Sequence, residues 1–369
     1  GLIVYPYVGY PLLLRLARLL GERPVARAPW TPEVTLIITA YNAAQTIRAK
    51  LENALALDYP ADRLHVIVAS DCSDDGTDAI VGEFAGRGVE LVALPERQGK
   101  VAAQNAAIER ARGEILVFSD ARIMLNPESI RAMMENFADP GVGCVSSTDR
   151  VLGENGTSGD GGEGLYVRYE MWLRDEEARR GTLIGASGSF YAVRRALAAR
   201  WEPALTRDFL TPLKVIEAGY RTVPEPRAIG TYRALTAPEA EFRRKVRTVM
   251  RGMAVLWSMR VLLDPIRHPG AAFRLWSHKV LRWTVPFFLL LLLVASLVLA
   301  AHSRFHAAAL VAQLVFYALA LAGYLHRGLE VFPFVKIPLF FTNVNLSILS
   351  AWFRFLAGGR QVTWEPTQR

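Results

Sequence analysis

The sequence predicts an α/β domain with a mixed, mainly parallel sheet, followed by a membrane region. Two runs of apolar and β-branched residues, VTLIITAYN at Val34–Asn42 and VIVASDCSDDGT at Val66–Thr77, each stop abruptly in small and polar residues. Strands that are buried on both faces of a parallel sheet have this composition. The third observation is a change of composition near Val280, after which charged residues become rare.

A helical segment joins the two predicted strands. Ala43 to Leu57 places apolar residues three and four positions apart, so strand, helix and strand form a right-handed βαβ unit. In such sheets the ligand binds beyond the carboxyl ends of the strands. The loops there carry a tyrosine together with polar and acidic side chains: Thr39, Tyr41, Asp71, Ser73, Asp75 and Thr77. An aromatic ring with carboxylates suits a nucleoside, and the phosphate-binding GxxxxGK pattern is absent.

Composition favours a membrane over nucleic acid as the partner. Lys and Arg number 43 against 35 Asp and Glu, and a basic excess attracts either nucleic acid or an anionic membrane surface. The arginines cluster beside apolar runs, so membrane lipids are the expected partner. The only cysteines, Cys72 and Cys144, predict no disulfide framework and fit a catalytic domain in the reducing cytosol.

The C-terminal region contains the predicted membrane crossings. Trp283–Ala301 and Ala307–Leu325 are uncharged and about 19 residues each, close to the ~20 that span the hydrocarbon core. Ile337–Phe353 is shorter and holds two asparagines. Arginines after it place the C-terminus on the cytoplasmic side, so we expect this third segment to be re-entrant or interfacial.

The N-terminal segment Leu2–Leu14 is uncharged but short, and arginines follow it. It is expected to be the end of a membrane helix, with the sheet domain on the cytoplasmic side. Between the sheet domain and the membrane, Pro238–His278 has the pattern of basic amphipathic helices. Its apolar stripe suits the headgroup plane or packing on the sheet domain, and the two are compatible. The predicted units are thus 1–28, 29–237, 238–281 and 282–369.

Segments that follow in order over roughly 215 residues resemble the motifs of inverting glycosyltransferases of family 2, in their polysaccharide synthase branch. The pair of strands with their polar ends comes first. Five motifs follow it: RQGKVAAQNAAI from Arg97, ILVFSDARIML from Ile115, GASGSFYAVRR from Gly185, TRD from Thr206 and RKVRT from Arg244. The resemblance implies the GT-A fold, a nucleotide-sugar donor and transfer with inversion.

The resemblance assigns a donor site to the first half of the domain. Ala40 and Tyr41 would lie at the nucleoside, and Asp71 would accept the imide N–H of a uracil base. From the residues alone, Asp71 also suits a helix cap, although Asp75 and Thr77 fit that role better. Lys100 would reach the diphosphate; the alternative is a solvated surface lysine.

Asp120 stands where the family's D-x-D motif holds Mg²⁺ or Mn²⁺. The sequence reads Asp120-Ala121-Arg122, so an arginine replaces the second acid. One carboxylate, phosphate oxygens and waters are enough to hold Mg²⁺. Metal use through Asp120 is therefore expected, with Arg122 turned away or bound to an outer oxygen of the donor.

The resemblance assigns the chemistry of transfer to the second half. Asp208 in T-R-D would be the catalytic base, and Gly185, Ser187 and Gly188 would admit the acceptor sugar. Each has a simpler explanation, a helix N-cap for the acid and a tight turn for the glycines.

RKVRT occupies the position of the synthases' Q-x-x-R-W motif. Arg244 and Arg247 would close over the diphosphate. Thr248 stands where the motif has tryptophan, so processive polymer synthesis is not expected.

The sequence is thus interpreted as a membrane-embedded glycosyltransferase of a bacterial or archaeal plasma membrane. UDP-sugar is the expected donor, and a polysaccharide or a lipid-linked saccharide the expected acceptor. Two alternatives stay open: a polyprenyl-phosphate sugar transferase, and an inactive subunit that binds nucleotide sugar in a polysaccharide exporter.

Overall fold

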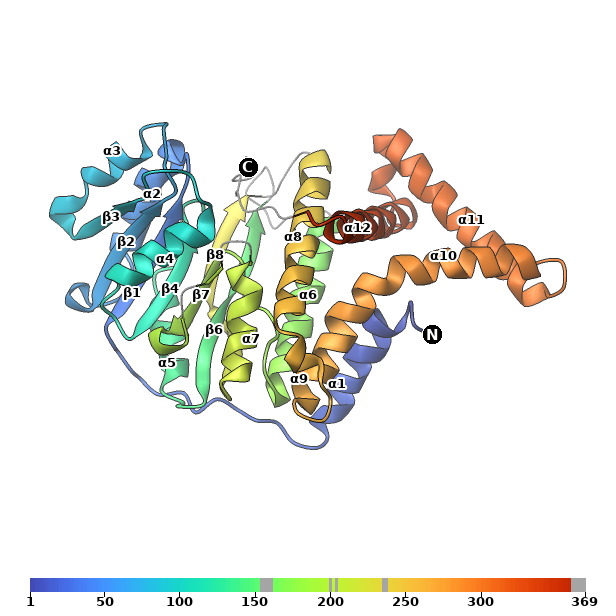
Figure 1. The fold of residues 1–369 in the computed structure, drawn as a ribbon, viewed down its shortest axis with the longest axis horizontal. Helices are drawn as coiled ribbons and strands as arrows, with labels where there is room; N and C mark the ends of the chain where they lie inside the picture. Colours follow the sequence, from blue (N-terminus) through green and yellow to red (C-terminus); the bar gives the residue numbers. More distant parts are fainter. Residues whose placement is uncertain (153–161, 199–200, 203–204, 234–237, 360–369) are drawn as a thin grey trace.

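A computed structural model describes residues 1–152, 162–198, 201–202, 205–233 and 238–359. An eight-stranded sheet with helices on both faces forms one side of the molecule, and long apolar helices form the other (Figure 1). The strand order is β3-β2-β1-β4-β7-β6-β8-β5. The strands are β1 (Val34–Ala40), β2 (Leu64–Ser70), β3 (Val89–Ala93), β4 (Ile115–Asp120), β5 (Met124–Leu125), β6 (Val142–Leu152), β7 (Phe190–Arg194) and β8 (Arg221–Arg233).

The first four strands of that order are parallel, as the sequence predicts. β1 pairs in parallel with β2 and with β4, and β2 pairs in parallel with β3. Every residue of β1 is buried, which explains its continuous run of β-branched and apolar residues. The carboxyl ends of β1 and β4 therefore meet at one edge of the sheet.

The second half of the sheet is mixed. β7 runs antiparallel to both β4 and β6, whereas β6 and β8 are parallel. Helices α2 (Ala44–Leu55) and α5 (Ser129–Phe137) pack on one face of the sheet, and α4 (Lys100–Arg110) and α7 (Arg207–Glu217) pack on the other. Short α3 (Thr77–Gly82) borders β3.

Helix α8 (Pro238–Ser258) lies between the sheet domain and the C-terminal helices (Figure 1). Its apolar stripe is buried: Val246, Met250 and Met253 pack against α7 or α12 (Pro333–Leu356). Packing of this stripe inside the protein is thus observed, while Trp257 at the end of α8 is 67% exposed. A position of α8 in the headgroup plane stays a prediction.

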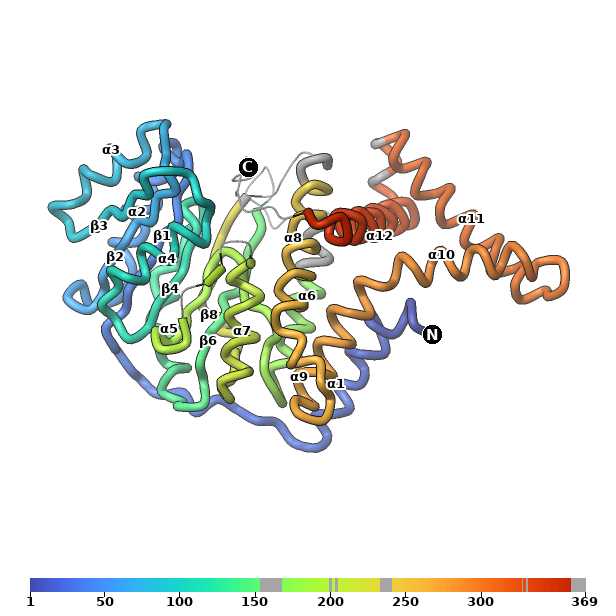
Figure 2. The backbone as a smooth tube through the Cα atoms, viewed as in Figure 1, coloured from blue at the N-terminus to red at the C-terminus, as the bar shows by residue number. Residues whose placement is uncertain are grey.

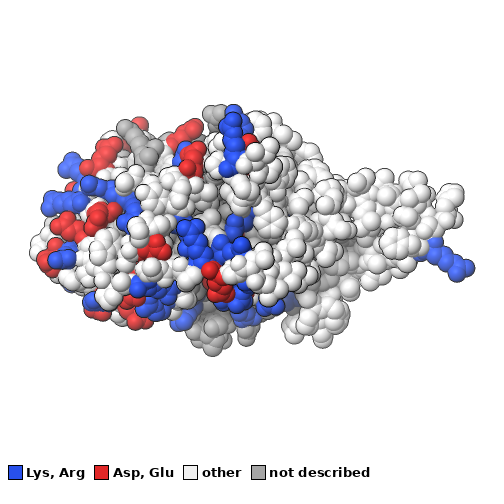
Figure 3. Space-filling model, turned by 90° about the horizontal axis from the view of Figure 1, so that it is seen from below, with Lys and Arg blue, Asp and Glu red and all other residues white. Residues whose placement is uncertain are grey.

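Three apolar helices are long enough to cross a membrane. α9 (Pro269–Arg274) continues through a π-helical turn into α10 (Leu281–Leu299), giving a helix of 31 residues; α11 (Arg304–Leu325) and α12 are the others. Seen from below, charged side chains gather over the sheet domain, and the surface of these helices is almost free of them (Figure 3).

The third of these helices bears on the expectation of a re-entrant or interfacial segment. α12 is one continuous helix of 24 residues that meets the length and composition of a span, so its backbone does not turn back on itself. An interfacial placement of this helix stays a prediction. Lys336 and Arg354 lie near the two ends of the helix, where long cationic side chains can keep their charged heads in water while their stems stay in apolar surroundings. Arg360 and Arg369, used in the sequence-based argument for this segment, lie outside the described residues.

The N-terminal segment forms a π-helical turn and α1 (Tyr10–Arg18), which pack on α6 (Gly162–Arg180). Tyr10 is fully buried and its hydroxyl donates to Glu177 Oε1 at 2.6 Å. The chain then runs as an extended segment along the edge of the sheet domain to β1 (Figure 2).

Candidate active site

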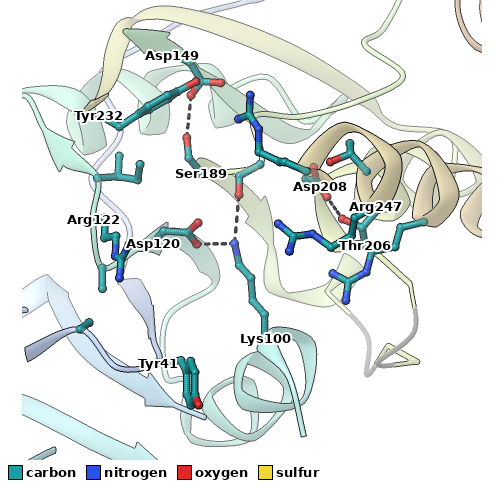
Figure 4. Close-up of a pocket in the computed structure, with 17 residues that line it drawn as sticks. Tyr41, Lys100, Asp120, Arg122, Asp149, Ser189, Thr206, Asp208, Tyr232 and Arg247 are labelled. Atoms are coloured by element: carbon teal, nitrogen blue, oxygen red, sulfur yellow. Dashed lines mark hydrogen bonds and ion pairs between the residues drawn. The ribbon is translucent and has the colours of Figure 1, made fainter. Parts of the chain in front are cut away.

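A cavity of about 340 Å³ opens beyond the carboxyl ends of β1 and β4 (Figure 4). Five cations and three carboxylates line it, with two tyrosines and several small residues. The lining is formed by Tyr41, Ala43, Lys100, Asp120, Ala121, Arg122, Ile123, Asp149, Gly188, Ser189, Thr206, Asp208, Tyr232, Arg244, Arg247, Thr248 and Arg251. The excess of positive charge makes this cavity a site for an anion.

Lys100 and Asp120 lie side by side at the centre of the cavity (Figure 4). Lys100 is the first residue of α4 and follows Gly99, whose φ of 94° suits glycine. Its ammonium forms an ion pair with Asp120 and donates to the Gly188 carbonyl at 3.3 Å. The lysine is therefore directed into the site rather than into solvent.

Asp71 is placed behind this lysine rather than in the cavity. Its side chain is 0% exposed, and its carboxylate accepts the backbone N–H groups of Gln98 at 2.9 Å and Gly99 at 2.9 and 3.0 Å. Asp71 thus holds the segment that presents Lys100. Its expected contact with a nucleobase is not among its contacts here and stays a prediction.

The other two residues of the predicted nucleoside site lie at the end of β1. Tyr41 lines the cavity, and the guanidinium of Arg97 stacks 4.1 Å from the centre of its ring. Ala40 is fully buried and its carbonyl accepts the N–H of Asp71 at 3.0 Å. Asp75, in the loop after β2, accepts the N–H of Ala44, the first residue of α2, at 2.9 Å. Burial raises the pKa of Asp75, but its hydrogen bonds outweigh this and leave the pKa lowered.

Asp208 lies in the first turn of α7 and points into the cavity (Figure 4). The helix N-terminus stabilises its negative charge. Thr206 donates its hydroxyl to Asp208 Oδ1. Directly opposite, a Cβ at Gly188 would lie 3.0 Å from Asp208 Oδ2. The glycine therefore keeps the carboxylate accessible to a third group.

Gly185 and Ser187 stand behind Gly188 and do not line the cavity. The Gly185 carbonyl accepts from Arg174 at 3.1 Å, and the Ser187 hydroxyl donates to Asp149 at 2.7 Å. Both fix the segment that carries Gly188. A direct contact between them and an acceptor stays a prediction.

Arg207, which replaces the middle acid of the family motif, points away from the cavity. It is buried, and it donates to Asn105 Oδ1 at 2.6 Å. Burial lowers its pKa to about 10. Its function is to fix the start of α7 against α4.

Helix α8 supplies three arginines to the cavity: Arg244, Arg247 and Arg251. They project from one face because their spacing of three and four residues matches the helical repeat. Burial lowers the pKa of Arg251, and the neighbouring charge of Arg247 lowers it further. A bound diphosphate would relieve this repulsion.

Four charged or aromatic residues at or beneath the site were not predicted from the sequence to belong to it. Asp149 and Tyr232 line the cavity from β6 and β8; the polar stretch SSTDR within β6 was the available signal for the acid. Arg251 continues the spacing of Arg244 and Arg247. The sequence gave no reason to single out Lys50, because a lysine in a predicted helix is usually exposed to solvent.

Lys50 is fully buried beneath the Asp120 turn. Its ammonium donates to Ser119 Oγ at 2.8 Å and to the Ile123 carbonyl at 2.5 Å, so it binds the chain on both sides of Asp120-Ala121-Arg122. Burial lowers the pKa of Lys50 to about 7, although the charge of Asp120 opposes this shift.

The candidate active site offers few side chains that could bind a divalent cation. The described residues contain no group of three or more His, Cys, Asp and Glu side chains placed to hold an ion. Asp120 is the acid at the sequence-predicted position, and it is paired with Lys100. The residues present fit a divalent cation only together with phosphate oxygens of a bound ligand.

The domain and the fold are decided by comparison with known proteins. Residues 35–200 match the model of glycosyl transferase family 2. A mannosyltransferase of Pyrobaculum calidifontis, solved with GDP-Man and Mn²⁺, superposes with a TM-score of 0.72 over 96% of both chains, at 25% identity. The chain carries a glycosyltransferase family 2 domain. The mixed, mainly parallel sheet of this family 2 domain is the predicted GT-A fold, which is thus confirmed.

Two curated relatives of the family 2 domain belong to polysaccharide biosynthesis. The succinoglycan biosynthesis protein ExoO of Rhizobium meliloti is 38% identical over 104 residues, 28% of this chain and 29% of that protein. The poly-β-1,6-N-acetyl-D-glucosamine synthase of Staphylococcus aureus is 25% identical over 216 residues, 57% of this chain and 52% of that protein. The chain spans about half or less of the length of these relatives.

Proposed function

We propose that this chain is a membrane-embedded, inverting glycosyltransferase that uses a nucleoside diphosphate sugar. The proposal depends on one observation: a single cavity holds Asp208 at a helix N-terminus, opposite a glycine, together with Lys100 and the arginines of α8. The Asp208 carboxylate suits proton removal from a hydroxyl. The lysine and the arginines suit stabilisation of a departing diphosphate.

The reaction follows from these two groups. The Asp208 carboxylate takes the proton of the acceptor hydroxyl, whose oxygen forms the new bond to the anomeric carbon. The bond from that carbon to the diphosphate oxygen breaks, and the nucleoside diphosphate keeps the electron pair. Attack from the face opposite the leaving group inverts the anomeric centre in one displacement. Lys100, Arg244 and Arg247 stabilise the charge that develops on the diphosphate.

A divalent cation is the expected cofactor, as the Mn²⁺ in the Pyrobaculum enzyme supports. Asp120 would hold it jointly with the diphosphate, where the ion would neutralise phosphate charge. Because Lys100 already pairs with Asp120, metal affinity should be low until nucleotide binds. Nucleotide titrated with and without Mn²⁺ tests this, and full activity in excess chelator would contradict it.

We infer a UDP-sugar as donor and a hydroxyl of a polysaccharide or lipid-linked saccharide as acceptor, at the cytoplasmic face of a bacterial or archaeal plasma membrane. The two curated relatives support the acceptor class, and the three candidate spans support the membrane. The GDP-Man of the Pyrobaculum enzyme makes guanosine the competing base.

Two alternatives differ from this proposal in their use of the cavity. A polyprenyl-phosphate sugar transferase attacks with a phosphate, which needs no strong base, and the position of Asp208 disfavours it. An inactive nucleotide-sugar-binding subunit is favoured by Arg122 alone, which replaces a family acid.

The deciding experiment is nucleotide release by the full chain in detergent. UDP- and GDP-sugars are screened with Mn²⁺ or Mg²⁺, and the product is sized. Release that Asp208→Asn abolishes supports the proposal. Binding of nucleotide sugar without release would establish the inactive subunit instead.

A further inference from the structure

A second cavity lies on the side of α8 that faces the membrane helices. Its volume is about 660 Å³, within the range of roughly 300–1,000 Å³ usual for ligand sites. Its walls come from the N-terminal part of α8, the C-terminal half of α11 and the middle of α12. We refer to this cavity as the α8 groove, lined by Glu241, Phe242, Arg243, Lys245, Tyr317, Ala320, Leu321, Tyr324, Leu339, Phe340, Thr342, Asn343 and Leu346.

The α8 groove combines an apolar interior with a cationic rim. Its α11 and α12 walls are mostly aliphatic and aromatic, whereas α8 contributes two cations and one acid. Lys245 Nζ lies 2.6 Å from Glu241 and 4.2 Å from the centre of the Phe340 ring. With Arg243, the rim keeps a net positive charge. An amphiphile with an apolar chain and an anionic head matches both parts.

The α12 wall of the groove also contains a polar atom that could bind a ligand. Thr342 Oγ1 is buried and has no hydrogen-bond partner in the part of the chain that the structure describes. A buried hydroxyl without a partner is costly, and a ligand oxygen or hydroxyl would satisfy it. This favours a ligand with polar atoms over a purely hydrocarbon filler.

Helix α8 connects the groove to the candidate active site. Arg243 and Lys245 line the groove, while Arg244, Arg247 and Thr248 line the cavity that holds Asp208. Lys245 and Thr248 are three positions apart, about 4.5 Å along a helix whose full diameter is about 10–12 Å. A head group at the rim therefore places the sugar attached to it at the edge of the active-site cavity.

We propose that the α8 groove binds the lipid chain and phosphate of a lipid-linked saccharide acceptor. The apolar chain lies between α11 and α12, and Arg243 and Lys245 bind the phosphate. The saccharide passes around α8 toward Asp208. An ordinary phospholipid would also match the apolar interior and the cationic rim of the groove, but it carries no saccharide that could enter the active-site cavity. This inference rests on the proposed function and specifies its acceptor.

The test uses the full chain in detergent and a prenyl diphosphate carrying N-acetylglucosamine as the probe, with binding followed by native mass spectrometry. Leu321→Trp fills the groove from α11. Leu314→Trp is the matched control, because Leu314 lies on the same helix, is 54% exposed against 57% for Leu321, and does not line the groove. We expect Leu321→Trp to weaken probe binding roughly tenfold or more, since it displaces apolar contacts, and Leu314→Trp to leave it unchanged.

A second variant guards against misfolding. Leu346→Trp fills the groove from α12 and should give the same loss as Leu321→Trp. Arg243→Gln should weaken the diphosphate probe but not the corresponding prenyl alcohol. Equal affinity of Leu321→Trp, Leu346→Trp and wild type, or equal competition by phosphatidylglycerol, would overturn the proposal.

The readouts separate this proposal from the proposed function. Hydrolysis of the sugar donor, in which water is the acceptor, needs only the active-site cavity. Leu321→Trp should therefore retain donor hydrolysis. Loss of probe binding with retained hydrolysis supports both. If wild type binds the probe but never releases nucleotide, and Leu321→Trp loses the probe, the groove is supported and the enzyme assignment is contradicted.

Discussion

At the scale of single residues, the site depends on side chains whose neighbours leave them little freedom. Asp208 faces Gly188 across a gap that a Cβ would fill, and Lys100 is fixed between Asp120 and the Gly188 carbonyl. Gly188 thus borders both the proposed base and the proposed diphosphate site. A side chain at this position would obstruct proton removal and lysine placement together.

Asp208→Asn tests the base. The amide keeps the shape and the helix-terminal position but accepts no proton, so turnover should fall by about 10² to 10⁴ while nucleotide affinity is retained. Initial rates of nucleotide release and calorimetric titration with UDP provide the two measurements. If turnover stays normal, Asp208 is only a helix cap.

Lys50 predicts a pH dependence of stability. Burial lowers its folded-state pKa to about 7 from 10.5, so between these values the unfolded chain binds more protons than the folded chain. The free energy of unfolding therefore gains a contribution that rises with pH through this window, and the cost of burying the charge is fully present below about pH 7. Thermal unfolding of wild type and Lys50→Met is compared across that window.

The expected result is a difference in unfolding temperature that shifts in favour of wild type as the pH rises. Lys214→Met is the control, since Lys214 is partly exposed and pairs with Glu217 at 2.7 Å. A pH-independent difference for Lys50→Met would show that Lys50 keeps its proton in the folded chain across this window, and it would contradict the lowered pKa.

At the scale of elements, α8 has a cationic face toward the active-site cavity and an apolar stripe against α12.

Arg247→Gln should weaken UDP binding about tenfold or more, because charged hydrogen bonds contribute about 1.5–3 kcal/mol. The loss should shrink as salt screens the charge. Arg260→Gln, on the 3₁₀ turn Arg260–Leu263 after α8, is the control. An unchanged affinity would exclude α8 from the donor site.

Periodicity and abrupt strand endings were enough to predict β1, β2 and the helix between them, and long uncharged runs predicted α10 and α11. They also predicted which loops would meet. They did not reveal that Asp71 is enclosed by the backbone of Gln98 and Gly99, because that contact joins segments 27 and 28 residues apart. The contacts of Lys50 and the full length of α12 were not predicted for similar reasons. Burial of a lysine and tolerance of charges at helix ends depend on tertiary neighbours.

At the scale of the whole molecule, the sheet domain and the long C-terminal apolar helices share a core. Residues of α7 such as Leu213 and residues of α8 such as Val255 belong to the same buried cluster as Leu275, Trp283 and Ile348 of the C-terminal helices. Removing residues 269–369 would expose this cluster. The truncated chain should aggregate or bind the dye ANS, and it should bind UDP less tightly, as calorimetry would show. A monomeric truncated chain with full UDP affinity would contradict a shared core.

The position of α8 also affects how relatives of this enzyme can be compared and recombined. The family model ends at residue 200, before Asp208 and before every arginine of α8. A chimera that exchanges only residues 35–200 would join one protein's Lys100 and Asp120 to the other protein's counterparts of Asp208 and the α8 arginines. Sequence classification confined to that segment therefore compares only some of the residues that line the candidate active site. A comparison of such proteins needs the α7 and α8 segments as well as residues 35–200.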